Sequence, residues 1–122
     1  MEYSVKIKET TRELTKREQI LFCDTTNTIK LNDIEVGNTI RIKPVDYAVL
    51  SVHNEFLKDR QDFEQYVIID DTGARYVTGS QSFFNAFKNI WEQMEGEPFE
   101  IDVYKIPSKN YKDKFIITCS IV

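Results

Sequence analysis

Alternation of apolar and polar residues predicts that most of this chain is β-strand, because successive side chains of a strand point to opposite faces. The pattern begins in residues 3–8 (YSVKIK) and becomes long and regular after residue 38. Pro44 interrupts the second stretch and predicts a bend or bulge, since proline cannot donate a hydrogen bond within a sheet. Strands are therefore expected over residues 3–8, 39–43, 45–52, 66–69, 75–78, 99–104 and 115–121.

Two segments carry the signals of a helix instead. Thr15 is followed three residues later by Glu18, which is the spacing of a capping box, and the apolar residues ILFC come directly after them. A short helix is therefore expected over residues 16–23. A longer helix is expected over residues 82–94, where apolar side chains recur at helical spacing and where glycine and proline follow. The polar residues 54–64 are expected to form a loop.

The order of these elements predicts a mostly β fold with one or two helices. From residue 38 the order is a long bent strand, two strands, a helix and two strands (β-β-β-α-β-β), which is the order of an OB-fold-like five-stranded barrel. Other small α+β barrels share this order and remain an alternative. We expect residues 37–122 to form the OB-like domain. Residues 1–36 are expected to form an N-terminal extension, a strand and a short helix, that packs on the barrel.

Composition narrows the classes of function. The 122 residues are 41% hydrophobic and 30% charged, as in a globular domain that folds without a disulfide or a metal. The net charge of -4 argues against a protein that coats duplex DNA through bulk positive charge. Two cysteines without a CxxC pair and a single histidine argue against a zinc site, so no cofactor or metal is expected.

Several motifs that would assign a function or a location are missing from the sequence. No Gly-rich phosphate loop, nucleophile elbow or metal-spaced cluster is present. His53 is the only histidine of the chain, and two interpretations of it are open: a general base, or a structural or surface residue. A non-catalytic protein is therefore expected. No apolar run is longer than four residues, which predicts neither a membrane span nor a signal peptide and favours a cytoplasmic protein.

A basic and aromatic segment over residues 104–115 (YKIPSKNYKDKF) is the strongest indication of a binding function. It contains four lysines against one acid. Single-stranded nucleic acids require cations along the phosphates and flat rings on which the bases stack. In an OB-fold the hairpin between the fourth and fifth strands borders the ligand groove. The predicted nucleic-acid-binding residues are Arg41, Lys43, Tyr47, Tyr104, Lys105, Lys109, Tyr111, Lys112 and Lys114.

The cations and the rings have different roles in this prediction. The four hairpin lysines would hold phosphates, and Arg41 and Lys43, on the outward side of the first long strand, would extend the basic track. Tyr104 and Tyr111 would stack on bases, and Tyr47 lies on a strand of the same face. Two alternatives remain open. In the first, the lysines only protect a sheet edge in a solvated turn. In the second, the strand tyrosines belong to the core.

The second half of the chain resembles a family. YVTGSQSF (residues 76–83), the helix after it, PSKNYK (107–112) and FIITCS (115–120) resemble small single-stranded DNA-binding proteins of phages and mobile elements of Gram-positive bacteria, as does VHNE (52–55). The resemblance covers residues 40–122. It implies an OB-like fold, single-stranded DNA as the ligand, with RNA left open, and work in DNA replication or recombination beside proteins of those pathways.

An acidic stretch supports a second hypothesis. Residues 92–102 contain five acids and no base. A surface of this kind favours an acidic protein-interaction module that binds a host or phage protein, including by mimicry of the charge of DNA. The sequence leaves the oligomeric state open.

Overall fold

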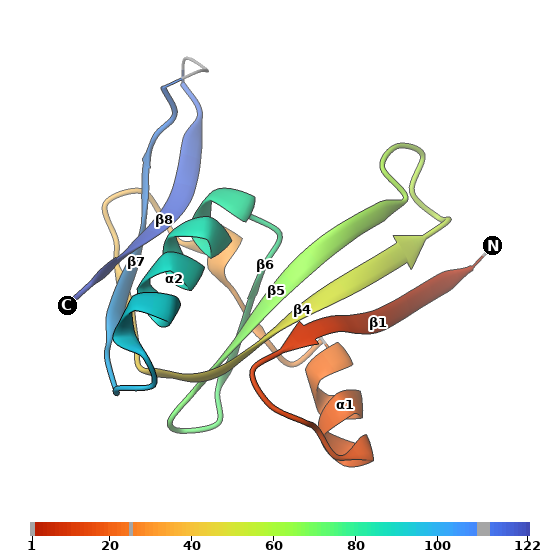
Figure 1. The fold of residues 1–122 in the computed structure, drawn as a ribbon. Coiled ribbons are helices and arrows are strands. Elements are labelled where there is room, and N and C mark those ends of the chain that lie inside the picture. Colours follow the sequence, from red (N-terminus) through yellow and green to blue (C-terminus); the bar gives the residue numbers. More distant parts are fainter. Residues whose placement is uncertain (1, 25, 110–112) are drawn as a thin grey trace.

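The computed structural model describes residues 2–24, 26–109 and 113–122 of the chain (Figure 1). Strands predominate, with two α-helices and one short 3-10 helix (η1) in this part of the chain. The predicted mostly β class is therefore confirmed. In chain order the elements are β1 (Tyr3–Thr10), α1 (Lys16–Cys23), β2 (Ile29–Lys30), η1 (Leu31–Asp33), β3 (Ile40–Ile42), β4 (Pro44–Asn54), β5 (Asp62–Asp70), β6 (Arg75–Thr78), α2 (Gln81–Met94), β7 (Ile101–Pro107) and β8 (Phe115–Ile121).

The strands form two sheets that share one bent stretch of chain. The larger sheet has the order β1-β4-β5-β6-β2, and the smaller has the order β3-β7-β8. Only Lys43 separates β3 from β4, and the pairing of β4 with β5 shifts register between Pro44 and Asp46. The predicted bend at Pro44 is thus confirmed. It lets the chain leave one sheet and enter the other within a few residues.

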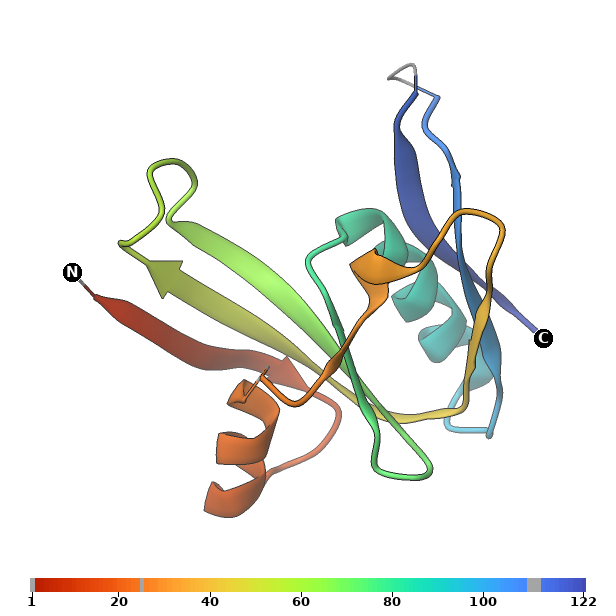
Figure 2. The ribbon, with the colours of Figure 1, turned by 180° about the vertical axis from the view of Figure 1, so that it is seen from behind.

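The predicted closed barrel is not found. Closure would require β6 to pair with β8, and no such pairing joins these strands in the described part of the chain. The edge of β6 is instead occupied by β2, which pairs with it in parallel through Ile29 and Lys30. Figure 2 shows this segment, in orange, running beside β6. A short strand from the N-terminal part of the chain therefore satisfies backbone groups that barrel closure would have used.

The main core lies between the two sheets and is filled by α2. Phe83 and Phe87 on this helix are fully buried, and they pack against apolar residues of both sheets, among them Ile68 and Val103. Ser80 begins the helix by accepting a hydrogen bond from the backbone N–H of Phe83. The predicted helix over residues 82–94 is confirmed, with one more residue at its start. Its aromatic stripe is core, as helical spacing implies.

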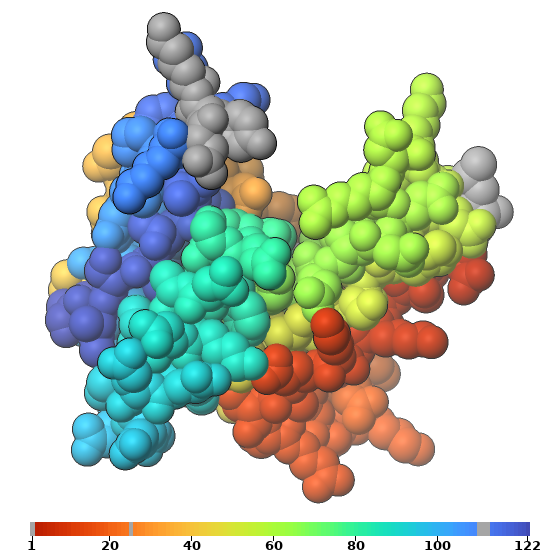
Figure 3. Space-filling model, turned by 45° about the horizontal axis from the view of Figure 1, so that its top comes forward, coloured from red at the N-terminus to blue at the C-terminus, as the bar shows by residue number. Residues whose placement is uncertain are grey.

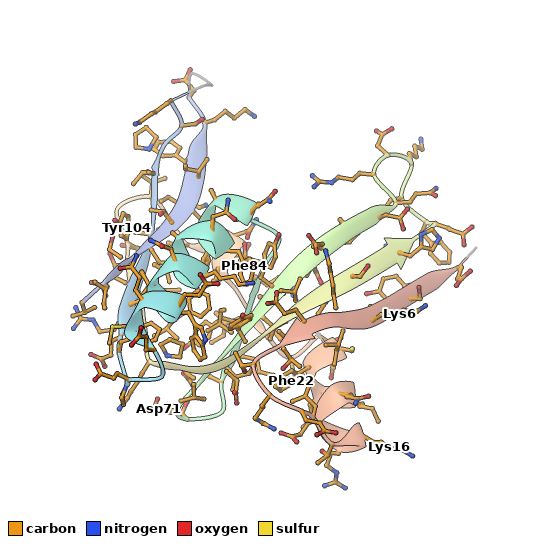
Figure 4. The ribbon with its side chains drawn as sticks, in the orientation of Figure 1. Lys6, Lys16, Phe22, Asp71, Phe84 and Tyr104 are labelled. Atoms are coloured by element: carbon orange, nitrogen blue, oxygen red, sulfur yellow. The ribbon has the colours of Figure 1, made fainter. Side chains whose placement is uncertain are left out.

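A second core covers the opposite face of the larger sheet. Phe22 of α1 packs there against Leu50 and Val67 of the sheet (Figure 4). The predicted helix over residues 16–23 is confirmed, and so is its capping box. The Thr15 hydroxyl accepts from the Glu18 N–H at 3.2 Å, while the Glu18 carboxylate accepts from the Thr15 N–H at 3.1 Å. α1 therefore starts where its local signal places it and buries its one large ring.

Residues 1–36 contribute strands to the larger sheet. β1 pairs antiparallel with β4 from Tyr3 to Thr10, and β2 pairs with β6, so these two strands form the two edges of the sheet. The division at residue 37 into an extension and an OB-like domain stays a prediction. The expected loop over residues 54–64 is shorter than predicted, because β5 starts at Asp62, opposite His53 of β4. Cross-strand pairing overrides the polar character of these residues.

Candidate functional site

Two β-hairpins project from the same side of the molecule (Figure 1). In the β4–β5 hairpin residues 55–61 join the two strands, and in the β7–β8 hairpin the first strand ends at Pro107 and the second begins at Phe115. With that side turned toward the viewer, the surface is hollowed between the two hairpins (Figure 3). We call this hollow the hairpin cleft. Because its two walls come from residues about fifty apart in the chain, only the folded structure brings them together.

The β7–β8 hairpin forms one wall and carries predicted phosphate ligands. Lys109 and Lys114 are exposed, and neither forms a salt bridge with another described residue. The backbone N–H of Ser108 donates to the Lys114 carbonyl at 2.8 Å, which holds the base of the turn. Phe115 follows directly and is 46% exposed. The predicted ligands Tyr111 and Lys112 lie outside the described residues.

The β4–β5 hairpin forms the other wall and has the same kind of side chains. Phe56 is 67% exposed. Lys58 and Arg60 are exposed as well, and no salt bridge involves either of them where the structure describes the chain. The Asn54 side chain accepts from the Phe56 N–H at 3.0 Å and shapes the turn. The sequence interpretation missed this hairpin because it treated the segment as a polar loop. An aromatic residue followed by two cations was the available signal.

The floor of the hairpin cleft lies where β6 leads into α2. The first turn of α2 contains no acidic residue, so the partial positive charge of its N-terminal end is not neutralised locally. Lys105 lies close by and is half-buried, and its ammonium donates to the backbone carbonyl of Asn32 at 2.9 Å. That bond ties the β7–β8 hairpin to η1. A pocket of about 220 Å³ beside the junction is lined by Lys30, Asn32, Gln65, Val77, Thr78 and Gly79.

The two described tyrosines among the predicted stacking residues do not face the cleft. Tyr47 is 5% exposed and packs edge-on against Phe84 and Trp91, so its ring belongs to the core. Burial also raises the pKa of its hydroxyl. Tyr104 lies on the face of its sheet opposite the core residue Val103, and its hydroxyl is 2.6 Å from the Ser120 hydroxyl (Figure 4). The exposed rings on the two hairpins are those of Phe56 and Phe115 instead.

The two predicted cations of the first long strand are also away from the cleft. Arg41 is bidentate with Asp102, at 2.9 and 3.3 Å, and this bond lowers the pKa of the carboxyl group. Asp102 is five residues from the end of β7 at Pro107, which is about 16 Å along a strand. Lys43 lies near Asp71, at the end of the molecule opposite the hairpins (Figure 4). The structure thus does not bring these cations into line with the hairpin lysines.

His53 stands at the base of the β4–β5 hairpin between two acids. Its Nδ1 lies 2.6 Å from the Asp62 carboxylate, and its Nε2 lies 3.4 Å from that of Glu55. The hydrogen bond with Asp62 raises the pKa of the imidazole above its ordinary value. A protonated ring can donate to both carboxylates at once. Protonation of His53 therefore offsets one of the two negative charges that would otherwise repel a polyanion at this wall.

Changing Asp62→Asn is expected to lower the pKa of His53 toward its ordinary value of about 6.5. Because the folded-state pKa is raised, the stabilisation from this contact is fully present below the unfolded value and is lost as pH rises through the folded value. An NMR titration measures the pKa of His53 directly, since the chain contains one histidine. Asp59→Asn, on the same hairpin, is the control and should leave the titration unchanged. An unaltered pKa in Asp62→Asn would contradict the assignment.

Three further observations concern chemistry and location. Within the described residues, no three side chains of His, Cys, Asp or Glu lie close enough to hold a metal ion. Cys23 and Cys119 are not bonded to each other, and burial raises the pKa of Cys119 to about 12, so that it is a thiol at neutral pH. Where the chain is described, its helices are too short or too polar to cross a membrane.

The two hairpins that border the cleft carry exposed cations and exposed rings, and such a pair can accept a flexible polyanion that also carries flat apolar groups. The geometry of the two hairpins, and not similarity to a known protein, supports this candidate site. No protein-family model, curated protein or solved structure matches the chain.

Proposed function

We propose that this protein binds single-stranded DNA in the hairpin cleft, without catalysis and without strong sequence preference. The observation that carries the proposal is the matched pair of hairpins. Each presents an exposed phenylalanine and two exposed cations, Phe56 with Lys58 and Arg60 on one wall and Phe115 with Lys109 and Lys114 on the other. Every base has a π-face and every nucleotide has a phosphate, so rings and cations bind all sequences comparably.

The pairing of the strands supports an OB-like fold, which is consistent with the proposed binding of single-stranded DNA. If the bent stretch β3–β4 is counted as one strand, a closed barrel of five strands needs five pairings. Four are present, namely β4 with β5, β5 with β6, β3 with β7, and β7 with β8. We propose an OB-like barrel that is open between β6 and β8. In an OB-fold the loops between strands one and two and between strands four and five flank the ligand, and the two hairpins correspond to these loops.

The biological setting of the proposal rests on the resemblance of residues 40–122 to phage and mobile-element proteins. It assigns the protein to replication or recombination of such DNA in the cytoplasm, beside proteins of those pathways. Single-stranded RNA offers the same phosphates and rings, so a comparison of dT and U oligomers belongs to the same measurement.

The double variant Lys109→Ala/Lys114→Ala is expected to weaken binding of a dT oligomer and to reduce its salt dependence. Each phosphate contact to a single strand contributes about 0.7 to the slope of log K against log salt, so two contacts account for roughly 1.4. Fluorescence anisotropy with a labelled dT oligomer of about 16 nucleotides, at several salt concentrations, measures the slope.

A matched control removes two cations elsewhere. Lys16→Ala/Arg17→Ala changes the net charge equally but lies on α1, which is far from the hairpins (Figure 4). Its slope should equal that of the unmodified protein. An equal reduction of the salt slope in both double variants would mean that net charge alone governs binding. The absence of binding at low salt would refute the proposed function.

A further inference from the structure

A second concave site lies at the end of the molecule opposite the hairpin cleft. It is a pocket of about 510 Å³ between the bend at Pro44, the β5–β6 turn and the C-terminal end of α2. More of its lining is apolar than polar. Its lining includes Lys43, Asp46, Asp71, Trp91, Glu97 and Phe99. The proposed nucleic-acid site shares none of them.

Aromatic and aliphatic side chains form the wall of this pocket. Trp91 packs edge-on against Tyr47 of the core at 5.3 Å between ring centroids, and against Phe99 at 6.0 Å, while it also lines the pocket. Val45 on the rim is 45% exposed. Rings held in place by the core give a preformed apolar surface, which loses little conformational entropy when a ligand binds.

The charge around the pocket is negative. Asp46 is already neutralised, because it accepts hydrogen bonds from Thr11 and Arg12. Asp71 and Glu97 are exposed, and neither is in a salt bridge with any residue that the structure describes. Lys43 is the opposing charge in the lining. The adjoining segment adds three exposed acids, which are Glu92, Glu95 and Glu100.

We propose that this pocket binds an extended segment of a partner protein in which an aromatic side chain is flanked by lysine or arginine. The apolar wall selects the ring, and the acidic rim selects the flanking cations by charge complementarity. The same rim repels phosphates, so the pocket is not a continuation of the nucleic-acid site. The acidic stretch of residues 92–102 thereby has a specific role as one side of a docking surface.

Trp91 makes the proposal directly measurable. It is the only tryptophan of the chain, so the intrinsic tryptophan fluorescence of the protein reports on this pocket alone. The probe is a synthetic peptide with a central phenylalanine between two lysines on each side. Two matched peptides replace the phenylalanine by alanine or the four lysines by glutamates. The first peptide is expected to cause a saturable change in fluorescence, and the other two should bind at least tenfold more weakly.

Charge reversal tests the rim. Asp71→Lys/Glu97→Lys should weaken binding of the lysine peptide at least tenfold and strengthen that of the glutamate peptide. Asp33→Lys/Asp59→Lys makes the same change in net charge away from the pocket and should leave the lysine peptide bound almost as before. Lys109→Ala/Lys114→Ala should also retain peptide binding. That last result keeps a failure of this inference distinguishable from a failure of the proposed nucleic-acid function.

Three outcomes would overturn the proposal. Equal affinity for the phenylalanine and alanine peptides would mean that only charge attracts the probe. Equal weakening by both charge-reversal variants would mean that the pocket is not the site. A fluorescence change that depends on protein concentration without peptide would identify a second copy of this chain as the occupant.

Discussion

Replacing Phe56 and Phe115 together by alanine is expected to weaken the binding of a dT oligomer by about thirtyfold or more. Stacking of one base on one aromatic ring contributes roughly 1–3 kcal/mol as judged by alanine substitution. Two such contacts contribute at least about 2 kcal/mol, and each 1.4 kcal/mol corresponds to a factor of ten in affinity.

The structure separates this loss of binding from a loss of folding. Phe56 and Phe115 are 67% and 46% exposed, so truncating them leaves no cavity in either core. Substitutions at such surface positions change the free energy of unfolding by about 0.5 kcal/mol or less. Anisotropy titrations at constant salt give the affinity, and the midpoint of urea unfolding gives the stability.

Each single variant adds information about the cleft. Loss in both Phe56→Ala and Phe115→Ala is expected if one strand of DNA contacts both walls. Loss in only one of them would place the DNA on a single hairpin and contradict the cleft. Ile20→Ala/Leu21→Ala removes two exposed apolar side chains of α1, which are 72% and 46% exposed, and serves as the control. Its affinity for the oligomer should be unchanged.

Local signals in the sequence predict the helices of this fold well. The capping box at Thr15 determines where α1 begins, because its two hydrogen bonds involve only residues three apart. The spacing of apolar residues likewise predicts α2. Pairing of strands depends on distant residues, so the sequence predicts it less well. β2 occupies the edge of β6 although only two residues pair, and no pattern in so short a segment predicts it.

The same distinction between local signals and distant contacts explains which parts of the candidate site can be predicted from the sequence. The basic and aromatic character of residues 104–115 is a local property that can be read from the sequence, and Lys109 and Lys114 of that hairpin are exposed. The surroundings of Tyr47 and Arg41 are not local. Tyr47 is covered by α2, and Arg41 faces Asp102 because β3 pairs with β7. The β4–β5 hairpin becomes part of a site only because the fold places it across from the other hairpin.

The largest effect on stability is expected for Phe87→Ala. Phe87 is fully buried on α2, in the core that both sheets share, and its ring packs against Tyr47, Phe83 and Trp91 at 5.7 to 5.9 Å between centroids. Truncating a buried phenylalanine costs about 3–5 kcal/mol, because apolar contacts are lost and a cavity remains. A domain of this size is stable by only about 5–15 kcal/mol, so this loss is a large part of the total.

Urea unfolding followed by circular dichroism measures this loss, with Phe84→Leu as a milder change in the same helix. Phe84 is 8% exposed and leucine retains most of the apolar volume, so its cost should be well below that of Phe87→Ala. A loss for Phe87→Ala below about 1 kcal/mol would mean that α2 is not the element that joins the two sheets. The β4–β5 and β7–β8 hairpins would then lack the common support that holds them on opposite walls of one cleft.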